Sequence, residues 1–123
     1  MGTREIVQGY FDGIAKKKGW EDFISDEMVF FGPNMGRRTG KEEYVGATVR
    51  FLRAVDSSKV SQLIIEGENS CAIVNYEMLS PKGNRLSADI AEIMTVRNGK
   101  IASSTLFFDT AAFNDFMAKG YRT

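Results

Sequence analysis

Residues 85–109 read RLSADIAEIMTVRNGKIASSTLFFD, and this stretch decides the fold. Apolar and polar side chains alternate through Arg85–Val96 and again through Ile101–Asp109, which is the period of a β-strand. Between the two runs, Asn98 and Gly99 tolerate the positive φ angles of a two-residue hairpin turn. The stretch therefore predicts two long antiparallel strands joined by a tight turn.

Upstream of this hairpin the sequence predicts three more strands, at Met28–Phe31, Val60–Glu66 and Cys71–Leu79. The remaining segments have helical periodicity. Apolar residues recur at three- and four-residue intervals in the first helix, at Ile6, Val7, Tyr10, Phe11 and Ile14. We expect a short amphipathic turn at Trp20, a third helix after Gly40 and a short closing helix from Thr110. Helices followed by an antiparallel meander indicate an α+β fold.

Composition excludes several classes of function. The chain has 123 residues, with 16 Lys+Arg balanced by 16 Asp+Glu, no histidine and one cysteine, Cys71. The length suits a single domain over residues 1–123, and zero net charge argues against binding to nucleic acid or to an anionic membrane. Without histidine, Ser-His and Cys-His nucleophile pairs and histidine-ligated metals are excluded, so we expect no metal and no cofactor. A lone cysteine cannot form an internal disulfide, which favours a cytoplasmic location.

Several short motifs occur at defined places along the predicted helices and strands. They are Tyr10-Phe11 in the first helix, Trp20-Glu21-Asp22-Phe23 opening the second, Gly40-Lys41-Glu42 opening the third, Asn98-Gly99-Lys100-Ile101 at the hairpin and Phe107-Phe108-Asp109 ending the last strand. In this order and spacing they make the chain similar to the NTF2-like superfamily, and more closely to its SnoaL-like bacterial members. The resemblance implies a cone of three N-terminal helices packed on a strongly curved antiparallel or mixed sheet, with a short C-terminal helix. It also implies an apolar pocket for a small molecule and a homodimer through the outer face of the sheet.

Alternation of side chains divides each strand between the pocket and the outside. By analogy with the family hairpin, we place the faces that carry Asn75, Glu92 and Asp109 inward. The pocket lining expected in addition to Glu92 and Asp109 is Tyr10, Phe30, Asn75, Glu77, Ile90, Met94 and Phe107. The opposite face is apolar and predicts a dimer interface of Val74, Tyr76, Met78, Ile93, Leu106 and Phe108.

Glu92 and Asp109 are the candidate catalytic residues. Desolvation raises the pKa of a buried carboxyl group towards neutrality, where it can act as a general acid or base. The resemblance matches Asp109 to the acid of epoxide-hydrolase relatives and Glu92 to the protonated acid of ketosteroid-isomerase relatives. However, the Arg-x-Asp of the hydrolases is replaced here by Ile73-Val74-Asn75, and the isomerase base falls at Gly32. Neither complete set of catalytic residues is present.

Each of these polar residues also has a structural interpretation. Asp109 precedes a helical pattern and is favoured as its N-cap, while Glu92 is equally suited to an ion pair across the strands or the dimer interface. Arg37 and Arg38 either guard the pocket mouth and favour an anionic ligand or belong to a solvated loop. Two functions therefore stay open. One is a small-molecule-binding protein with carboxylate acid/base chemistry of the isomerase, cyclase or dehydratase type, and the other is a non-catalytic binding or interaction domain.

Overall fold

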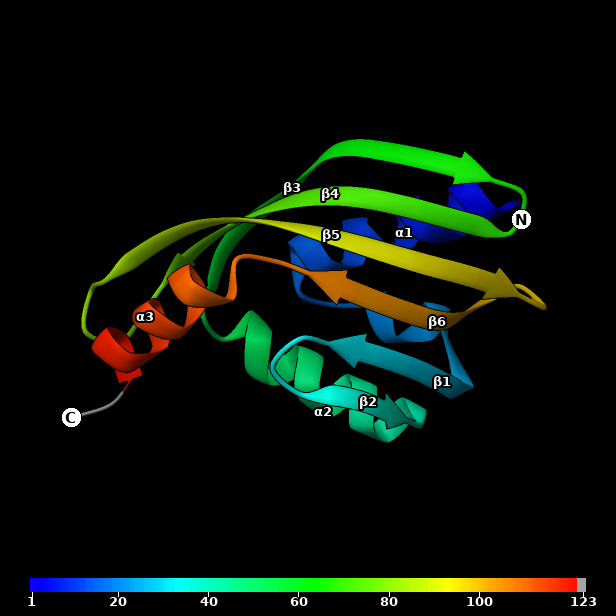
Figure 1. Ribbon diagram of the computed structural model, residues 1–123. Helices are drawn as coiled ribbons and strands as arrows, with labels where there is room; N and C mark the ends of the chain where they lie inside the picture. The colour runs from blue at the N-terminus through cyan, green and yellow to red at the C-terminus, as the bar shows by residue number, and fades with distance from the viewer. Residues whose placement is uncertain (122–123) are drawn as a thin grey trace.

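A computed structural model describes residues 1–121, which form three α-helices and one six-stranded sheet (Figure 1). The elements are α1 (Thr3–Lys16), the short 3-10 helix η1 (Trp20–Phe23), β1 (Ile24–Gly32), β2 (Gly36–Thr39), α2 (Lys41–Leu52), β3 (Val55–Glu66), β4 (Asn69–Leu79), β5 (Arg85–Arg97), β6 (Lys100–Phe107) and α3 (Thr110–Tyr121). The strand order is β2-β1-β6-β5-β4-β3, with β1 parallel to β6 and every other pair antiparallel. The predicted α+β class is confirmed.

The hairpin predicted around Asn98 and Gly99 forms as expected. Arg97 pairs with Lys100, and the two turn residues have φ angles of 53° and 77°. Positive φ at both central positions is the geometry that matches the right-handed twist of the flanking strands. The local sequence therefore determines how β5 is aligned with β6.

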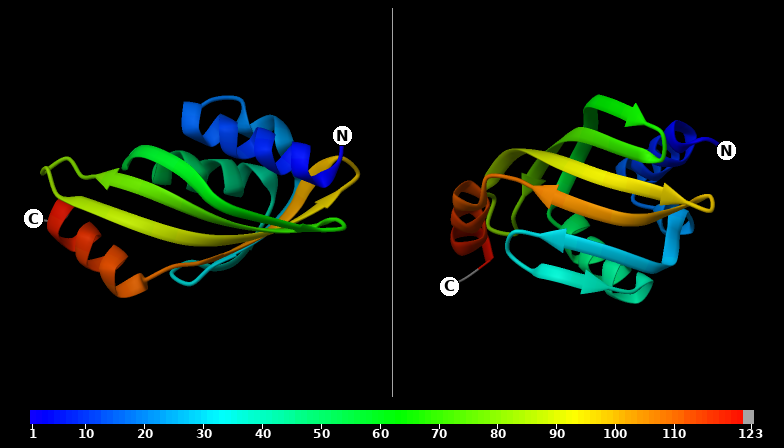
Figure 2. Two further views of the ribbon diagram at one scale, coloured as in Figure 1. Left: turned by 90° about the horizontal axis from the view of Figure 1, so that it is seen from above. Right: turned by 45° about the vertical axis from the view of Figure 1, so that its right-hand side comes forward.

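The sheet curves around the two helices that cover one of its faces. Figure 2 shows α1 and α2 lying together on that face, while α3 lies at the end of the sheet where β5 begins. Irregularities in register interrupt β1, β3 and the β5–β6 pair, and such bulges bend a strand and increase its twist. The long antiparallel strands can therefore enclose space beneath the helices instead of forming a flat sheet.

The prediction of three N-terminal helices is wrong in number and order. Of the three α-helices in the described residues, α1 alone precedes the sheet, α2 lies between β2 and β3, and α3 follows the last strand. The expected turn at Trp20 is a 3-10 helix of 4 residues. It begins after Gly19, which has a φ of 83°, and β1 starts at Ile24, so no room remains for an α-helix.

The inward face of β4 is the opposite of the predicted one. Ala72, Val74, Tyr76 and Met78 are buried against the helices, whereas Asn75 and Glu77 point outward. Residues directly opposite in an antiparallel pair share a face, and Ala72 pairs with Glu92. When Glu92 faces inward, the even-numbered residues of β4 must therefore face inward as well. The prediction from the family analogy had placed the odd-numbered residues of β4 inward.

The predicted dimer interface is wrong for the same reason. Val74, Tyr76 and Met78 belong to the core, and Leu106, which pairs with Glu92, and Phe108 also turn inward. Of the six residues, Ile93 lies on the outer face and is 44% exposed. No helix in residues 1–121 has both the length and the apolar composition needed to cross a membrane.

The predicted stripe of the first helix is confirmed, and its two glycines have a packing role. All five apolar residues of the stripe are buried. A Cβ at Gly13 would lie 2.7 Å from the backbone nitrogen of Trp20, and one at Gly9 would lie 2.5 Å from the Phe23 ring. The glycines let the η1 segment cross α1 at close range, which offsets their cost in helix propensity.

Exchanging two helical glycines for alanine should have opposite effects on stability. Gly13→Ala forces a methyl group against backbone and should lower the free energy of unfolding by about 1–3 kcal/mol. Gly46→Ala in α2, where the new methyl would meet only the Arg50 guanidinium at 3.5 Å, should raise it by about 0.5–1 kcal/mol. Urea denaturation of the two variants checks this, and equal effects would contradict the close approach of η1 to α1.

Candidate functional site

A largely apolar cavity of about 150 Å³ lies between the sheet and the helices. Every α-helix and the strands β1, β4, β5 and β6 contribute to it. The lining residues are Tyr10, Ile14, Phe30, Gly32, Asn34, Met35, Tyr44, Ala47, Thr48, Phe51, Leu52, Tyr76, Ile90, Glu92, Leu106, Phe108 and Phe113. An apolar cavity of this size is large enough to hold a benzene-sized molecule.

Aromatic rings make up much of the cavity wall, and six of them form edge-to-face pairs. The pairs and their centroid separations are Phe30 with Tyr44 at 5.1 Å, Phe51 with Tyr76 at 5.0 Å, and Phe108 with Phe113 at 5.3 Å. Such pairs are more favourable than area burial alone predicts, and they hold each ring in one orientation. The wall is therefore built from side chains that are fixed by one another.

Glu92 is the one carboxyl group among the lining residues described. It projects inward from β5, is 4% exposed, and accepts a hydrogen bond of 2.6 Å at Oε2 from the hydroxyl of Tyr76 on β4. Burial raises the pKa of Glu92 to about 7, although the Tyr76 hydrogen bond acts in the lowering direction. Near neutral pH the group therefore exchanges between a neutral acid and a carboxylate, which suits a general acid or base.

Two more tyrosines complete the polar part of the lining. The hydroxyls of Tyr10 on α1 and Tyr44 on α2 lie 2.5 Å apart and share a hydrogen bond. Burial, and secondarily nearby groups that include Glu92, raises the pKa of both tyrosines above the ordinary value. Burial is also the main cause of the raised pKa of Tyr76. All three hydroxyls stay protonated at neutral pH and can donate or accept hydrogen bonds.

The structure brings together four of the residues expected to line the pocket, namely Tyr10, Phe30, Ile90 and Glu92. Met94 is buried on the same face of β5 but is not part of the lining. Phe107 is 51% exposed on the outer face, next to Phe108, which does line the cavity. The alternation in β6 was predicted correctly, but its phase was not.

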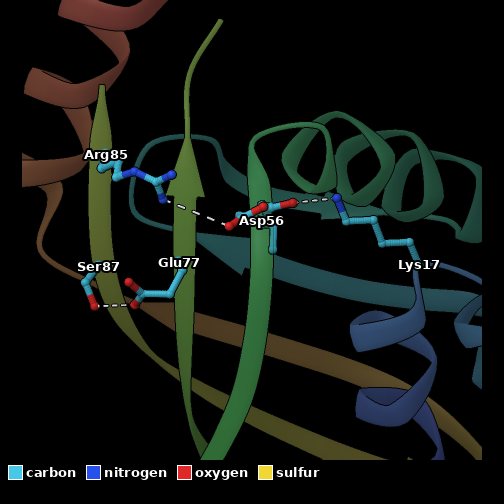
Figure 3. A network of polar contacts seen from close by, with 6 residues as sticks. Lys17, Asp56, Glu77, Arg85 and Ser87 are labelled. Carbon is cyan, nitrogen blue, oxygen red and sulfur yellow. Dashed lines mark hydrogen bonds and ion pairs between the residues drawn. The ribbon is translucent and has the colours of Figure 1, made fainter. Parts of the chain in front are cut away.

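Asn75 and Glu77 lie on the far side of the sheet, so their predicted place in the lining is wrong. Figure 3 shows Glu77 beside Ser87, whose hydroxyl donates a hydrogen bond of 2.5 Å to its carboxylate. The Asn75 amide donates to Ser87 at 3.0 Å and to Asp89 at 3.1 Å. The hydrogen bonds of Asn75 and Glu77 therefore belong to the outer surface of the sheet. Figure 3 also shows Lys17 of α1, which donates a hydrogen bond to the backbone carbonyl of Val55 at the start of β3.

Asp109 lies outside the cavity as well. Strand β6 ends at Phe107, so its alternation does not extend to Asp109, which is exposed. The carboxylate accepts a hydrogen bond of 3.0 Å from the backbone N–H of Ala112 in the first turn of α3. This is the N-cap arrangement that the sequence offered as the alternative to a catalytic role.

Sequence reasoning missed Tyr44 and Tyr76 as site residues. Tyr76 was assigned to the wrong face, although continuing the alignment of Ala72 with Glu92 along β4 would have placed it inward. Tyr44 lies in the helix that was predicted after Gly40, but the prediction of a helix does not indicate which part of the sheet it meets. Its proximity to Tyr10, 34 residues earlier, is a product of the tertiary fold.

The β1–β2 turn and α3 form the rim of the cavity. Asn34 in the turn donates a hydrogen bond of 3.0 Å to Asn114 of α3, and Met35 beside it is partly exposed. Arg37 and Arg38 lie in β2, which replaces the loop expected there, and neither lines the cavity. Arg38 instead forms an exposed ion pair with Glu43 at 3.6 Å.

Within residues 1–121, no group of three or more histidine, cysteine, aspartate or glutamate side chains is arranged to hold a metal ion.

Comparison with known proteins gives one family and one fold. The profile of the SnoaL-like domain matches residues 7–104. A search of curated proteins finds no match.

Several solved structures are similar to this chain in fold, and three of them illustrate the range of sequence identity. An NTF2-like protein of unknown function from Cytophaga hutchinsonii has 20% identity over 93% of this chain and 96% of that one, with a TM-score of 0.76. A provisionally designated SnoaL-like polyketide cyclase from Jannaschia sp. CCS1 has 15% identity over 98% of this chain and 92% of that one, with a TM-score of 0.81. TerC, co-crystallised with polyporic acid, has 18% identity over 92% of this chain and 95% of that one, with a TM-score of 0.78. Each shares the fold of this chain.

The buried carboxyl group should make stability depend on pH in a specific direction. In the folded protein the pKa of Glu92 is about 7, against an ordinary value of 4.5, so the unfolded chain loses this proton first as pH rises. The contribution to stability is complete below pH 4.5 and is lost as pH rises to 7, by on the order of 3 kcal/mol. Urea denaturation between pH 5 and 8 should show this loss in the wild type relative to Glu92→Gln.

Glu77→Gln, which changes a carboxylate on the opposite face, is the control and should follow the wild type. An equal pH dependence in the wild type and Glu92→Gln would contradict the raised pKa.

Proposed function

Because this chain belongs to the SnoaL-like domain family, we propose that it binds a small, mainly apolar molecule in the cavity around Glu92. The observation that carries the proposal is a single buried carboxyl group that lines an apolar cavity walled by paired aromatic rings. Keeping a carboxyl group in such a site lowers stability near neutral pH, so it calls for a compensating role. The apolar wall supplies binding energy, and Glu92 with the tyrosine hydroxyls orients one polar group of the ligand.

Binding is the primary proposal because the second candidate acid is occupied elsewhere. Asp109 caps α3 and does not line the cavity, so one carboxyl group is left for chemistry. Proton transfer by Glu92, in a reaction of the isomerase, cyclase or dehydratase type, is the second candidate function. It is supported by the pKa of about 7, which allows Glu92 both to give and to take a proton.

TerC, a protein of the same fold, was co-crystallised with a small molecule, polyporic acid. That precedent supports a ligand-binding cavity in this chain but does not identify its ligand. A cytoplasmic location remains a prediction from the composition.

Filling the cavity should abolish binding of a small apolar probe. Ala47 lines the cavity from α2, whereas Val49 on the same helix is 40% exposed and outside it. We expect phenol to shift the amide NMR signals of lining residues in the wild type and in Val49→Phe. In Ala47→Phe the affinity should fall tenfold or more, because the new ring occupies the ligand volume. Phenol shifts confined to residues outside the cavity, or unchanged affinity in Ala47→Phe, would refute the proposal.

A homodimer through the outer face of the sheet is also proposed, with a revised set of residues. Directly paired positions form a row across five strands, and the row consists of Ile64, Cys71, Ile93, Thr105 and Phe31. Ile64 is 54% exposed, and Ile93 and Phe107 are also exposed on this face. A contiguous apolar area of this kind is characteristic of interaction surfaces.

Sedimentation velocity tests the dimer directly. The wild type should sediment at twice the chain mass of 13.7 kDa, and Ile93→Arg should be monomeric because the charge would be buried at the interface. Ile93 makes no cavity contact, so phenol binding should be unaffected in this variant. A wild-type monomer at micromolar concentration would contradict the assembly.

A further inference from the structure

The cavity lining carries charge of one sign only. Glu92 is its one carboxyl group, and within the described residues no lysine or arginine lines it. The other titratable groups around Glu92 are tyrosines, namely Tyr10 from α1, Tyr44 from α2 and Tyr76 from β4, while β6 contributes Leu106. None of these groups can become positive. An ionised Glu92 therefore has no counter-ion among the lining residues that the structure describes.

The hydrogen bonds of Glu92 leave one of its oxygens free for a ligand. Tyr76 donates to Oε2, and no hydrogen bond to Oε1 comes from residues 1–121. Because Glu92 lines the cavity, this oxygen can receive a donor from inside it. The shared hydrogen bond of Tyr10 and Tyr44 also leaves acceptor lone pairs on their oxygens.

The aromatic wall has the same electrostatic preference. The face of an aromatic ring carries partial negative charge and attracts cations, most strongly where water is excluded. In the Phe30–Tyr44 and Phe51–Tyr76 pairs the ring planes are 83° and 85° apart, so the rings are turned in different directions around the cavity. Aromatic rings arranged around a small space are a recognised solution for binding organic ammonium groups.

An anionic ligand has no such support. Arg37 and Arg38, the candidates for guarding the mouth, are exposed and outside the lining, and Arg38 is paired with Glu43. An anion would meet the carboxyl group of Glu92 and the negative faces of the rings, with no compensating positive charge in the described part of the lining. The choice is therefore between a neutral and a cationic polar group.

We propose that the polar group recognised in this cavity is the ammonium of a small organic amine, held among the aromatic rings with Glu92 as its counter-ion. This inference rests on the proposed binding function and specifies the class of ligand. A cation favours the ionised carboxylate, so binding releases the proton that Glu92 holds in the empty cavity. Since the pKa of Glu92 is about 7 before binding, affinity for a permanent cation should rise with pH through neutrality.

Choline and 3,3-dimethylbutan-1-ol provide the test, because they have nearly the same shape and differ by one positive charge. Isothermal titration at pH 8 should show choline binding at least tenfold more tightly than the alcohol. At pH 6, where about a tenth of Glu92 is ionised, choline affinity should be roughly tenfold lower, while that of the alcohol stays constant. Glu92→Gln should lose most of the choline preference and all of its dependence on pH, because only the aromatic rings are left to favour the cation. The amide NMR spectrum of this variant checks that the fold is intact.

Glu77→Gln is the matched control, since it removes a carboxylate from the outer face and should keep the wild-type preference. Equal binding of the two compounds by the wild type, or a choline preference of undiminished size in Glu92→Gln, overturns the ammonium inference and leaves the binding function in place. If phenol binds and neither choline nor the alcohol binds, the ammonium inference is also overturned and the binding function stays in place. If phenol also fails to bind in the cavity, the binding function itself is refuted.

Discussion

The hydrogen bond between Tyr76 and Glu92 is the interaction on which the site depends. It joins two neighbouring strands at a point where a carboxyl group has been taken out of water. A buried carboxyl group without a partner would be strongly destabilising, and this one has a single hydroxyl donor at 2.6 Å. The result is a group that is stable enough to remain in the core and changes its protonation near neutral pH.

The rest of the fold places that group in the lining of the cavity. The Asn98–Gly99 turn sets the alignment of β5, which turns Glu92 inward, and the bulges let the sheet curve around α1 and α2. Paired aromatic rings then brace the wall, so the cavity does not collapse around its polar group. The same arrangement leaves the outer face of the sheet with exposed apolar residues, so the proposed dimer interface and the proposed ligand cavity lie on opposite faces.

Local sequence predicted those features that depend on neighbouring residues. The alternation in residues 85–107, the hairpin turn and the buried stripe of α1 formed as expected, because each follows from backbone and side-chain periodicity. The inward face of β4 was missed because alternation gives two equivalent choices, and only the pairing of Ala72 with Glu92 decides between them. Asp109 was misplaced because the end of β6 is set by the start of α3, and the meeting of Tyr10 with Tyr44 depends on how two helices pack on one sheet.

The proposed site requires Glu92 to be a buried, titratable acid in the cavity, and a carbon-13 NMR titration of its side-chain carboxyl carbon measures this directly. We expect a midpoint near pH 7 in the free protein. A midpoint near the ordinary value of 4.5 would mean that Glu92 is solvated or paired with a cation, and would contradict the site described.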